Sequence, residues 1–302
     1  MDMLTVNFKN QFKDKLIYDS IVFDNIDENV KLHEETKGNP LSSAAACLNV
    51  LGSMMNNQIE LLCFLNHFDL EIEELIEFPS NCIVGDSLYT DKGYVVFEWV
   101  GPQISPINEK GGGRGNYRTS IDAFIIAKIK RKITQLLIEW KFTEGKSRPL
   151  ALERFAGSKG LERLNRYANI LVSMRGKSDF PFNFSEEKGL GLYDLSADHL
   201  YQLLRMTLLV KTTTPIEIGG LKIEDYRIVH MSHSQNNDIE ILHDKYLESC
   251  PGLKKYAGMK MYDVGYDILS PYDKEKFKSG HWDKAIGNIK NVELRDYLKK
   301  RY

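Results

Sequence analysis

The sequence has few cysteines, and no two of them stand in a metal-binding or redox spacing. The 302 residues contain four, with no C-x-x-C pair: Cys47, Cys63, Cys82 and Cys250. A zinc ribbon and a disulfide-stapled scaffold both need paired, regularly spaced cysteines, so both are excluded. The scattered thiols favour a reducing compartment, and we expect a cytoplasmic protein.

Long apolar runs, a leader segment and low-complexity tracts are also missing. No stretch approaches the roughly 18 uninterrupted apolar residues of a membrane span, and the first residues show no basic segment followed by an apolar one. We therefore expect neither a membrane span nor a secretory signal. With nine prolines the chain has no Pro-rich linker, and it has no internal repeat. The 42% hydrophobic content is typical of a globular protein with a sizeable core.

The net charge is small, but the charges are unevenly distributed. The formal net charge is −2, whereas residues 128–177 hold thirteen basic and four acidic residues. A basic middle in an otherwise acidic chain is typical of a protein that binds a polyanion such as nucleic acid. A solvated helical surface rich in Lys and Arg has the same pattern, so charge alone leaves both interpretations open.

The chain divides into three predicted parts. We expect an acidic N-terminal segment over residues 1–40 and a core over residues 41–250. A C-terminal extension rich in Tyr and Lys, residues 251–302, is expected to pack on the core.

Periodicity within the core predicts both helices and strands. Apolar spacing of three and four predicts helices over residues 42–62, 70–77, 161–172 and 200–208. Runs of β-branched and aromatic residues predict strands over residues 93–100, 119–127, 133–141 and 226–231. This order predicts an α/β fold with a mixed central sheet flanked by helices.

The two strands around Lys130 and Arg131 carry the most informative residues. If these two residues form the centre of a hairpin turn, Asp122 lies directly opposite Glu139, and opposed residues share a face of the sheet. Lys141, two residues after Glu139, leaves from that same face. The register therefore predicts that the three charged side chains converge, whereas a slip of one residue would send Asp122 to the other face.

Such a triplet has a chemical use. Mg²⁺ is commonly held by one or two protein carboxylates, with water and phosphate oxygens completing its octahedron. The metal lowers the pKa of bound water, and a nearby ammonium offsets negative charge in a transition state. A structural salt bridge between Glu139 and Lys141 on a solvated strand end explains the same residues, and periodicity does not separate the two.

At this point the residues resemble a known family. Asp122 followed by Glu139-Trp140-Lys141 is similar to the D…(D/E)xK core of the PD-(D/E)XK nuclease superfamily, although Ile121 stands where the superfamily has its Pro. More closely, a bacterial group named as restriction endonucleases carries T-S-x-D-A and E-W-K-[YF]-T-E strands, which residues 119–123 and 139–144 resemble. The resemblance covers roughly residues 40–230, and Ser42-Ser43 and residues 201–205 also look like positions that the group shares.

The resemblance implies a restriction-endonuclease-like fold and Mg²⁺-dependent hydrolysis of DNA, with Mn²⁺ as a substitute metal and a role in restriction or defence. Asp122, Glu139 and the backbone carbonyl of Trp140 would hold the metal, and Lys141 would assist the attacking water. A homodimer is compatible with this function, and no membrane partner is expected. The alternative is a catalytically silent nucleic-acid-binding or defence protein of the same fold, which the intact Asp/Glu/Lys set argues against.

The acid that completes the site is open among Glu60, Glu98 and Glu109. We favour Glu109 as a catalytic residue because it lies close to Asp122 in the sequence.

Four further polar residues are predicted to contact nucleic acid, and two histidines are not predicted to bind zinc. Arg114 and Arg118, in and beside a glycine-rich loop, could reach a phosphate backbone, and Gln202 and Arg205 lie on the helix that the resemblance places near the active site. His230 and His233 lack cysteine partners and helical i, i+4 spacing, so they do not indicate a zinc site.

Overall fold

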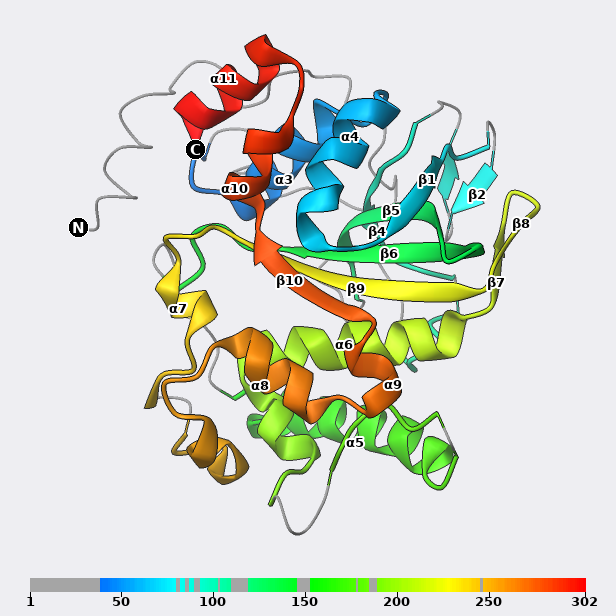
Figure 1. Cartoon of the computed structure of the whole chain (residues 1–302). Helices are drawn as coiled ribbons and strands as arrows, with labels where there is room; N and C mark the ends of the chain where they lie inside the picture. Colours follow the sequence, from blue (N-terminus) through cyan, green and yellow to red (C-terminus); the bar gives the residue numbers. More distant parts are fainter. Residues whose placement is uncertain are drawn as a thin grey trace.

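The hairpin predicted from residues 121–141 forms the centre of a six-stranded sheet in the computed structural model (Figure 1). The structure describes residues 39–79, 82–84, 87–89, 93–102, 104–109, 119–145, 153–177, 179–184, 189–244 and 247–302. The predictions for the N-terminal segment, Arg114 and Arg118 lie outside the described residues.

The sheet is mixed, as predicted. Its strand order is β1-β5-β6-β9-β10, and β4 also pairs with β5. β5 is antiparallel to β1, β4 and β6, whereas β6, β9 and β10 run parallel to one another. The strands of this sheet are β1 (Ile72–Ile76), β4 (Val96–Trp99), β5 (Ile121–Ile129), β6 (Lys132–Trp140), β9 (Asp225–Ser232) and β10 (Phe277–His281). Two short hairpins stand apart from it: β2 (Cys82–Val84) with β3 (Ser87–Tyr89), and β7 (Ile216–Ile218) with β8 (Leu221–Ile223).

Helices cover both faces of the sheet (Figure 1). On one face lie α3 (Ser43–Gly52), α4 (Gln58–Leu65), α10 (Trp282–Ala285) and α11 (Val292–Arg301). On the other lie α5 (Gly157–Met174), α6 (Asp198–Thr213), α8 (Met261–Ile268) and α9 (Pro271–Lys274), while α7 (Asn237–Glu240) follows β9. Among the described residues, no helix is long and apolar enough to cross a membrane.

Alternation along the central strands explains the two hydrophobic cores. Successive strand residues point to opposite faces, so Phe124 and Leu137 pack toward α5 and α6 while Ile125 and Ile138 pack toward α3 and α4. Both strands are buried on both faces, which is why their sequences are almost continuously apolar.

The predicted hairpin register is confirmed. Ala123 pairs with Ile138 and Ile129 with Lys132, and the same register places Asp122 opposite Glu139. The turn residues Lys130 and Arg131 both have positive φ, 49° and 66°. Two central residues of positive φ match the right-handed twist of the flanking strands, as the two-residue turn of a tight hairpin requires.

Two helix predictions in the first part of the core are wrong. The segment predicted as one helix over residues 42–62 is two helices, separated by a turn at residues 53–57. In this turn the Met55 carbonyl accepts a hydrogen bond from the backbone N–H of Tyr94 (2.8 Å), and Asn57 caps the second helix. The segment predicted as an acidic helix over residues 70–77 is instead strand β1, at the edge of the sheet. Asp69 and Glu71 have positive φ, which interrupts a helix, and pairing with β5 then decides the conformation.

Two later helices are confirmed, with one difference in their buried face. α5 and α6 cover the predicted residues. In α5, Leu161 and Val172 were assigned to the apolar stripe, but they are 55% and 69% exposed. The buried side of the helix is formed instead by residues such as Tyr167, Ile170 and Met174.

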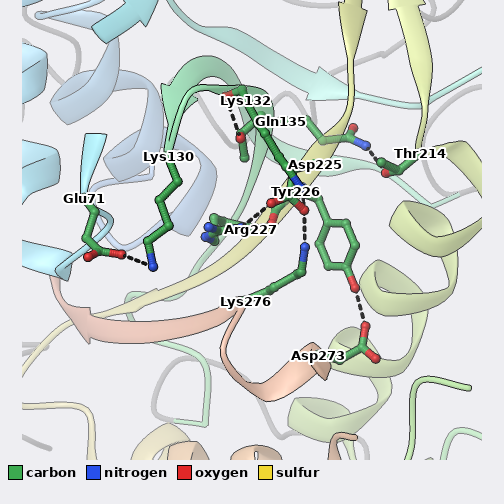
Figure 2. Close-up of polar contacts among 11 residues, drawn as sticks. Glu71, Lys130, Lys132, Gln135, Thr214, Asp225, Tyr226, Arg227, Asp273 and Lys276 are labelled. Carbon is green, nitrogen blue, oxygen red and sulfur yellow. Dashed lines mark hydrogen bonds and ion pairs between the residues drawn. The ribbon is translucent and has the colours of Figure 1, made fainter. Parts of the chain in front are cut away.

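A polar network ties together the end of the sheet opposite the carboxyl ends of β6 and β9 (Figure 2). Lys276 bonds to Asp225 at the start of β9, and the Tyr226 hydroxyl donates to Asp273, which α9 carries. Gln135 of β6 donates to the Thr214 hydroxyl at 2.7 Å. Because these side chains bond to one another across separate elements, the network stabilises this end of the fold.

Candidate active site

Asp122 and Glu139 lie side by side at one end of the two central strands. Asp122 is near the amino end of β5 and Glu139 near the carboxyl end of β6, and the observed register puts both on the face covered by α6. The backbone N–H of Trp140 donates to Asp122 Oδ2 at 2.7 Å, which fixes the aspartate against the neighbouring strand. The convergence predicted from the hairpin is therefore present.

The two carboxylates repel each other in a buried setting. Burial raises the pKa of Asp122 well above its usual range, the charge of Glu139 raises it further, and Lys141 only partly offsets these effects. Glu139 is 4% exposed. Water therefore screens the repulsion poorly, and the pair is stabilised by any cation between the carboxylates.

Lys141 supplies one such positive charge. Its ammonium forms an ion pair with Glu139. Burial alone would lower the pKa of Lys141, but Glu139, Glu144 and Asp122 outweigh it and raise that pKa, so the side chain stays protonated. Its backbone is clamped on both sides, since its N–H donates to the Met231 carbonyl (2.8 Å) and its carbonyl accepts from the Trp282 indole (2.9 Å).

The residues after Lys141 anchor the strand end to the first helix. The Phe142 N–H donates to Ser43 Oγ at 2.8 Å, and the Thr143 hydroxyl donates to the Leu41 carbonyl at 2.7 Å. Ser42 caps the same helix by accepting from the Ala45 N–H (3.2 Å). The Ser42-Ser43 pair and the E-W-K-F-T-E strand therefore meet in space, which gives both motifs a shared role in holding Lys141.

Glu109 belongs to a second buried cluster beside the first. It accepts from the backbone N–H of Thr119 (2.5 Å), the Thr119 hydroxyl (2.8 Å) and the Tyr167 hydroxyl (3.2 Å). Arg205 lies 3.5 Å from Glu109 and also donates to Thr119 Oγ1 (3.0 Å) and Gln202 Oε1 (3.3 Å). The structure thus brings Glu109, Gln202 and Arg205 together, and the guanidinium already has protein partners.

Arg205 connects this cluster to the carboxylates. Burial alone would lower its pKa, but the neighbouring Tyr167, Glu109 and Glu139 raise it, so the guanidinium remains charged. It is one more positive charge within electrostatic reach of Glu139, and its partner Thr119 lies three positions before Asp122 in the sequence.

The other two candidate acids have different positions. Glu60 accepts from the backbone N–H groups of Lys290 (2.7 Å) and Asn291 (2.9 Å). It therefore links α4 to the segment that precedes α11. Glu98 is buried, accepts from the Ser120 hydroxyl at 2.5 Å and lies near enough to Asp122 to raise its pKa. Of the two, Glu98 adjoins the carboxylate pair.

Sequence reasoning missed His230 as a neighbour of the site. Parallel pairing of β6 with β9 sets His230 beside Glu139. Burial, assisted by the charge of Lys141, lowers the pKa of His230 to about 4, so its imidazole is neutral near pH 7. Its companion His233 lies elsewhere, packed between the rings of Phe142 and Trp282. The H-M-S-H spacing at the end of a predicted strand was the available signal in the sequence.

A small cavity adjoins Glu139. Its volume is about 30 Å³, and Glu139, Gln202, His230 and Tyr262 are among its lining residues. That volume exceeds the roughly 10–15 Å³ that one water needs. The space beside Glu139 is therefore large enough for the water that a hydrolytic reaction consumes.

The chain matches a protein family over almost its whole length. The family model described as "Restriction Endonuclease associating with ARP" matches residues 9–302. The chain belongs to this family. No curated protein and no solved structure matched the chain. The match confirms the resemblance to restriction endonucleases, and with it a nuclease-related or defence-related family.

The donor set suits Mg²⁺ better than a softer metal. In the part of the chain that the structure describes, no three side chains of His, Cys, Asp or Glu gather as a metal site. What is present is a pair of repelling carboxylates, Asp122 and Glu139, next to the backbone of Trp140. Mg²⁺ commonly uses one or two carboxylates and keeps several waters, whereas structural zinc takes four protein ligands. The residues fit the cation that the resemblance implies.

Proposed function

We propose that this protein is an Mg²⁺-dependent endonuclease that hydrolyses DNA phosphodiester bonds in restriction or defence. The observation that supports it most is the carboxylate pair of half-buried Asp122 and buried Glu139, which share one face with the ammonium of Lys141. Such a charge cluster is costly for stability. Its presence at the end of the central strands, in a restriction endonuclease family, favours a catalytic use.

In this proposal each residue has a distinct task. Asp122, Glu139 and the main-chain carbonyl of Trp140 would hold Mg²⁺, with Mn²⁺ as a substitute. When bound, the metal would acidify a water molecule and neutralise charge on the phosphoryl group. Lys141, held by two backbone hydrogen bonds, orients the attacking water and stabilises the negative charge of the transition state.

The second cluster supports the first. Glu109 accepts four hydrogen bonds or ion-pair contacts, and we assign it a positioning role that acts through Arg205. Gln202 lines the same cavity as Glu139, and its amide remains a predicted contact for a DNA phosphate at the mouth of the site. Arg114 and Arg118 remain predicted phosphate contacts. The family description names association with ARP, and we propose that this chain likewise works with such a partner, as a monomer or a homodimer.

Plasmid cleavage tests the proposal directly. Supercoiled DNA is incubated with the wild type and with Asp122→Asn, Glu139→Gln and Lys141→Met, in Mg²⁺, Mn²⁺ or chelator. Glu293→Gln, in the first turn of α11, is the matched control. We expect nicked or linear DNA only with metal, and only from the wild type and the control. Cleavage that survives chelation, or that all three variants retain, would refute the assignment.

One observation favours the alternative of a silent binding protein. Lys141 is already paired with Glu139, and Asp122 already accepts from Trp140, so the cluster is satisfied in part without a metal. That alternative predicts DNA binding by gel shift with no cleavage on methylated or unmethylated plasmid, and equal binding by the Lys141→Met variant.

A further inference from the structure

A second cavity lies next to the proposed active site and has no role in it. Its volume is about 140 Å³, and it is lined from β9, α7, α8 and β10. His230, Met261 and Tyr262 line both this cavity and the smaller one at Glu139, so the two are neighbours. The sheet residues that line it lie at the carboxyl ends of the parallel strands β9 and β10, the end of a sheet where open α/β folds bind ligands.

The size of this cavity matches one six-membered ring. An apolar protein cavity of about 150 Å³ accommodates a benzene molecule. A pyrimidine base has a ring of that size, whereas the fused rings of a purine need more room. Tyr262 and Met261 supply an aromatic and an aliphatic wall, and the Tyr262 ring is itself held by stacking on Phe277, with centroids 5.4 Å apart.

The carboxylate of Glu240 is the main hydrogen-bond acceptor among the polar groups of the cavity. Glu240 Oε1 accepts from the Ser232 hydroxyl (2.8 Å) and pairs with His281 Nδ1 (2.9 Å). Its other oxygen, Oε2, has no protein hydrogen-bond donor among the described residues. Lys260, on the same cavity, is a donor.

Glu240 remains ionised in this setting. Burial alone would raise its pKa, but the hydrogen bonds from His281 and Ser232 outweigh burial and hold the pKa below its ordinary value. A carboxylate acceptor beside an ammonium donor complements a cytosine edge, which offers an amino donor next to ring acceptors. Thymine would place a carbonyl oxygen against the carboxylate instead.

We infer that this cavity binds a cytosine-type base, a pyrimidine with an exocyclic amino group, drawn out of the DNA duplex beside the cleaved strand. The DNA origin of the base rests on the proposed nuclease function. The preference of the cavity for a cytosine-type base does not depend on that function. Enzymes that extrude a base read it by hydrogen bonds to its pairing edge and by contact with aromatic and apolar side chains. Both kinds of contact are present here.

Glu240→Gln provides a sharp test because its geometry is constrained. The Ser232 hydroxyl donates to Glu240 Oε1 and His281 Nδ1 lies 2.9 Å from the same oxygen. We therefore expect the amide oxygen of Gln to keep that place and its NH₂ to replace Oε2. The substitution turns an acceptor into a donor while changing the shape little. We expect wild type to bind 2′-deoxycytidine about tenfold more tightly than thymidine, and Glu240→Gln to reverse that preference; one correct base contact is worth ~1–3 kcal/mol.

Calorimetry with the two nucleosides, in chelator so that no DNA chemistry intervenes, measures this preference on the full chain. Glu217→Gln, on the separate β7–β8 hairpin, is the matched control and should behave as wild type. Circular dichroism of each variant verifies folding. Equal binding of both nucleosides, or an unchanged preference in Glu240→Gln, would overturn the inference even if the wild type cleaves plasmid.

A second arm identifies the source of the base. A duplex carrying pyrrolo-cytosine, which fluoresces more strongly when it leaves the base stack, is titrated with wild type in chelator. A rise in fluorescence that Glu240→Gln abolishes supports extrusion from DNA. Tight deoxycytidine binding without that rise would overturn the DNA source and point to a free nucleotide. Failure of plasmid cleavage alone would refute the nuclease proposal, and the nucleoside preference would still stand.

Discussion

At the scale of single residues, Asp122 is where stability and the proposed chemistry conflict. It is half-buried beside the buried Glu139 and Glu98, and one lysine only partly offsets their charge. An acid whose pKa is higher in the folded than in the unfolded state destabilises the fold increasingly as pH rises above its unfolded pKa of about 3.9. Charge strain of this kind is expected at functional sites.

Asp122→Asn should therefore stabilise the protein and abolish cleavage. The amide keeps an acceptor for the Trp140 N–H and removes the repulsion. We expect a gain of about 1 kcal/mol near neutral pH, growing with pH above about 4. Urea unfolding at several pH values measures it. Asp198→Asn, which breaks the ion pair with Arg154, should instead destabilise slightly; a loss of stability in Asp122→Asn would contradict the repulsion argument.

Glu139→Gln and Lys141→Met should fail in different ways. Removing the Glu139 charge takes away a metal ligand, so Mn²⁺ affinity and turnover should both fall. Lys141→Met leaves both carboxylates, so Mn²⁺ should bind at least as well as in wild type. Turnover should still drop by about 10²–10⁴, since the ammonium acts in the transition state. Calorimetric Mn²⁺ titration beside cleavage rates tests this, and parallel loss of metal affinity in both variants would refute the division of roles.

At the scale of elements, buried acids hold segments together that are far apart in the chain. Glu60 of α4 is the acceptor for two backbone donors just before α11. Glu109 plays a comparable part between Thr119, Tyr167 of α5 and Arg205 of α6. The two glutamates share burial, but only the second adjoins the proposed catalytic residues.

Glu60→Ala should weaken the fold without removing cleavage. Two donors lose their acceptor, and each buried unsatisfied group costs about 1–3 kcal/mol. Glu293→Ala, on the exposed side of α11, should change the free energy of unfolding by less than about 0.5 kcal/mol. Denaturant unfolding and plasmid cleavage below the transition check both variants. A cleavage defect in a folded Glu60→Ala variant would indicate that Glu60 contributes to the active site after all.

At the scale of the whole molecule, the basic tract in the hairpin turn lies at the end of β5 and β6 opposite the carboxylates. Ile129 lies seven positions after Asp122 along β5, a span of about 23 Å at ~3.3 Å per residue. Lys130 pairs with Glu71 at 2.8 Å, and the Arg131 N–H donates to Glu73. The tract thus faces the acidic edge strand β1.

Charge reversal at Lys130, Arg131 and Lys132 should leave DNA affinity within about twofold of wild type at physiological salt. The Debye length there is about 8 Å, so exposed charges this far from the site contribute little. Fluorescence anisotropy with a labelled duplex in chelator measures the affinity. The DNA affinity of the turn variant is compared with that of a second variant, in which the charges of Lys159 and Arg163 at the start of α5 are reversed. A large loss from the turn variant would place DNA along the hairpin rather than across the sheet edge.

The sequence alone determined the local features of this protein. The hairpin register, and with it the meeting of Asp122 with Glu139, could be predicted because a two-residue turn and a period of two leave one arrangement. The helices α5 and α6 could be predicted from long apolar periodicity, although the exposed Leu161 shows that periodicity does not decide which face is covered.

Tertiary structure alone decided what depends on distant partners. Residues 72–76 form a strand because β5 offers an edge, and short acidic segments carry too weak a local preference to resist it. His230 reaches Glu139 through parallel pairing of strands about ninety residues apart, and no local pattern encodes such a pairing. The partners of Glu60, Glu98 and Glu109 are equally non-local: a carboxylate's role is set by the donors that folding brings to it, and those donors come from elsewhere in the chain.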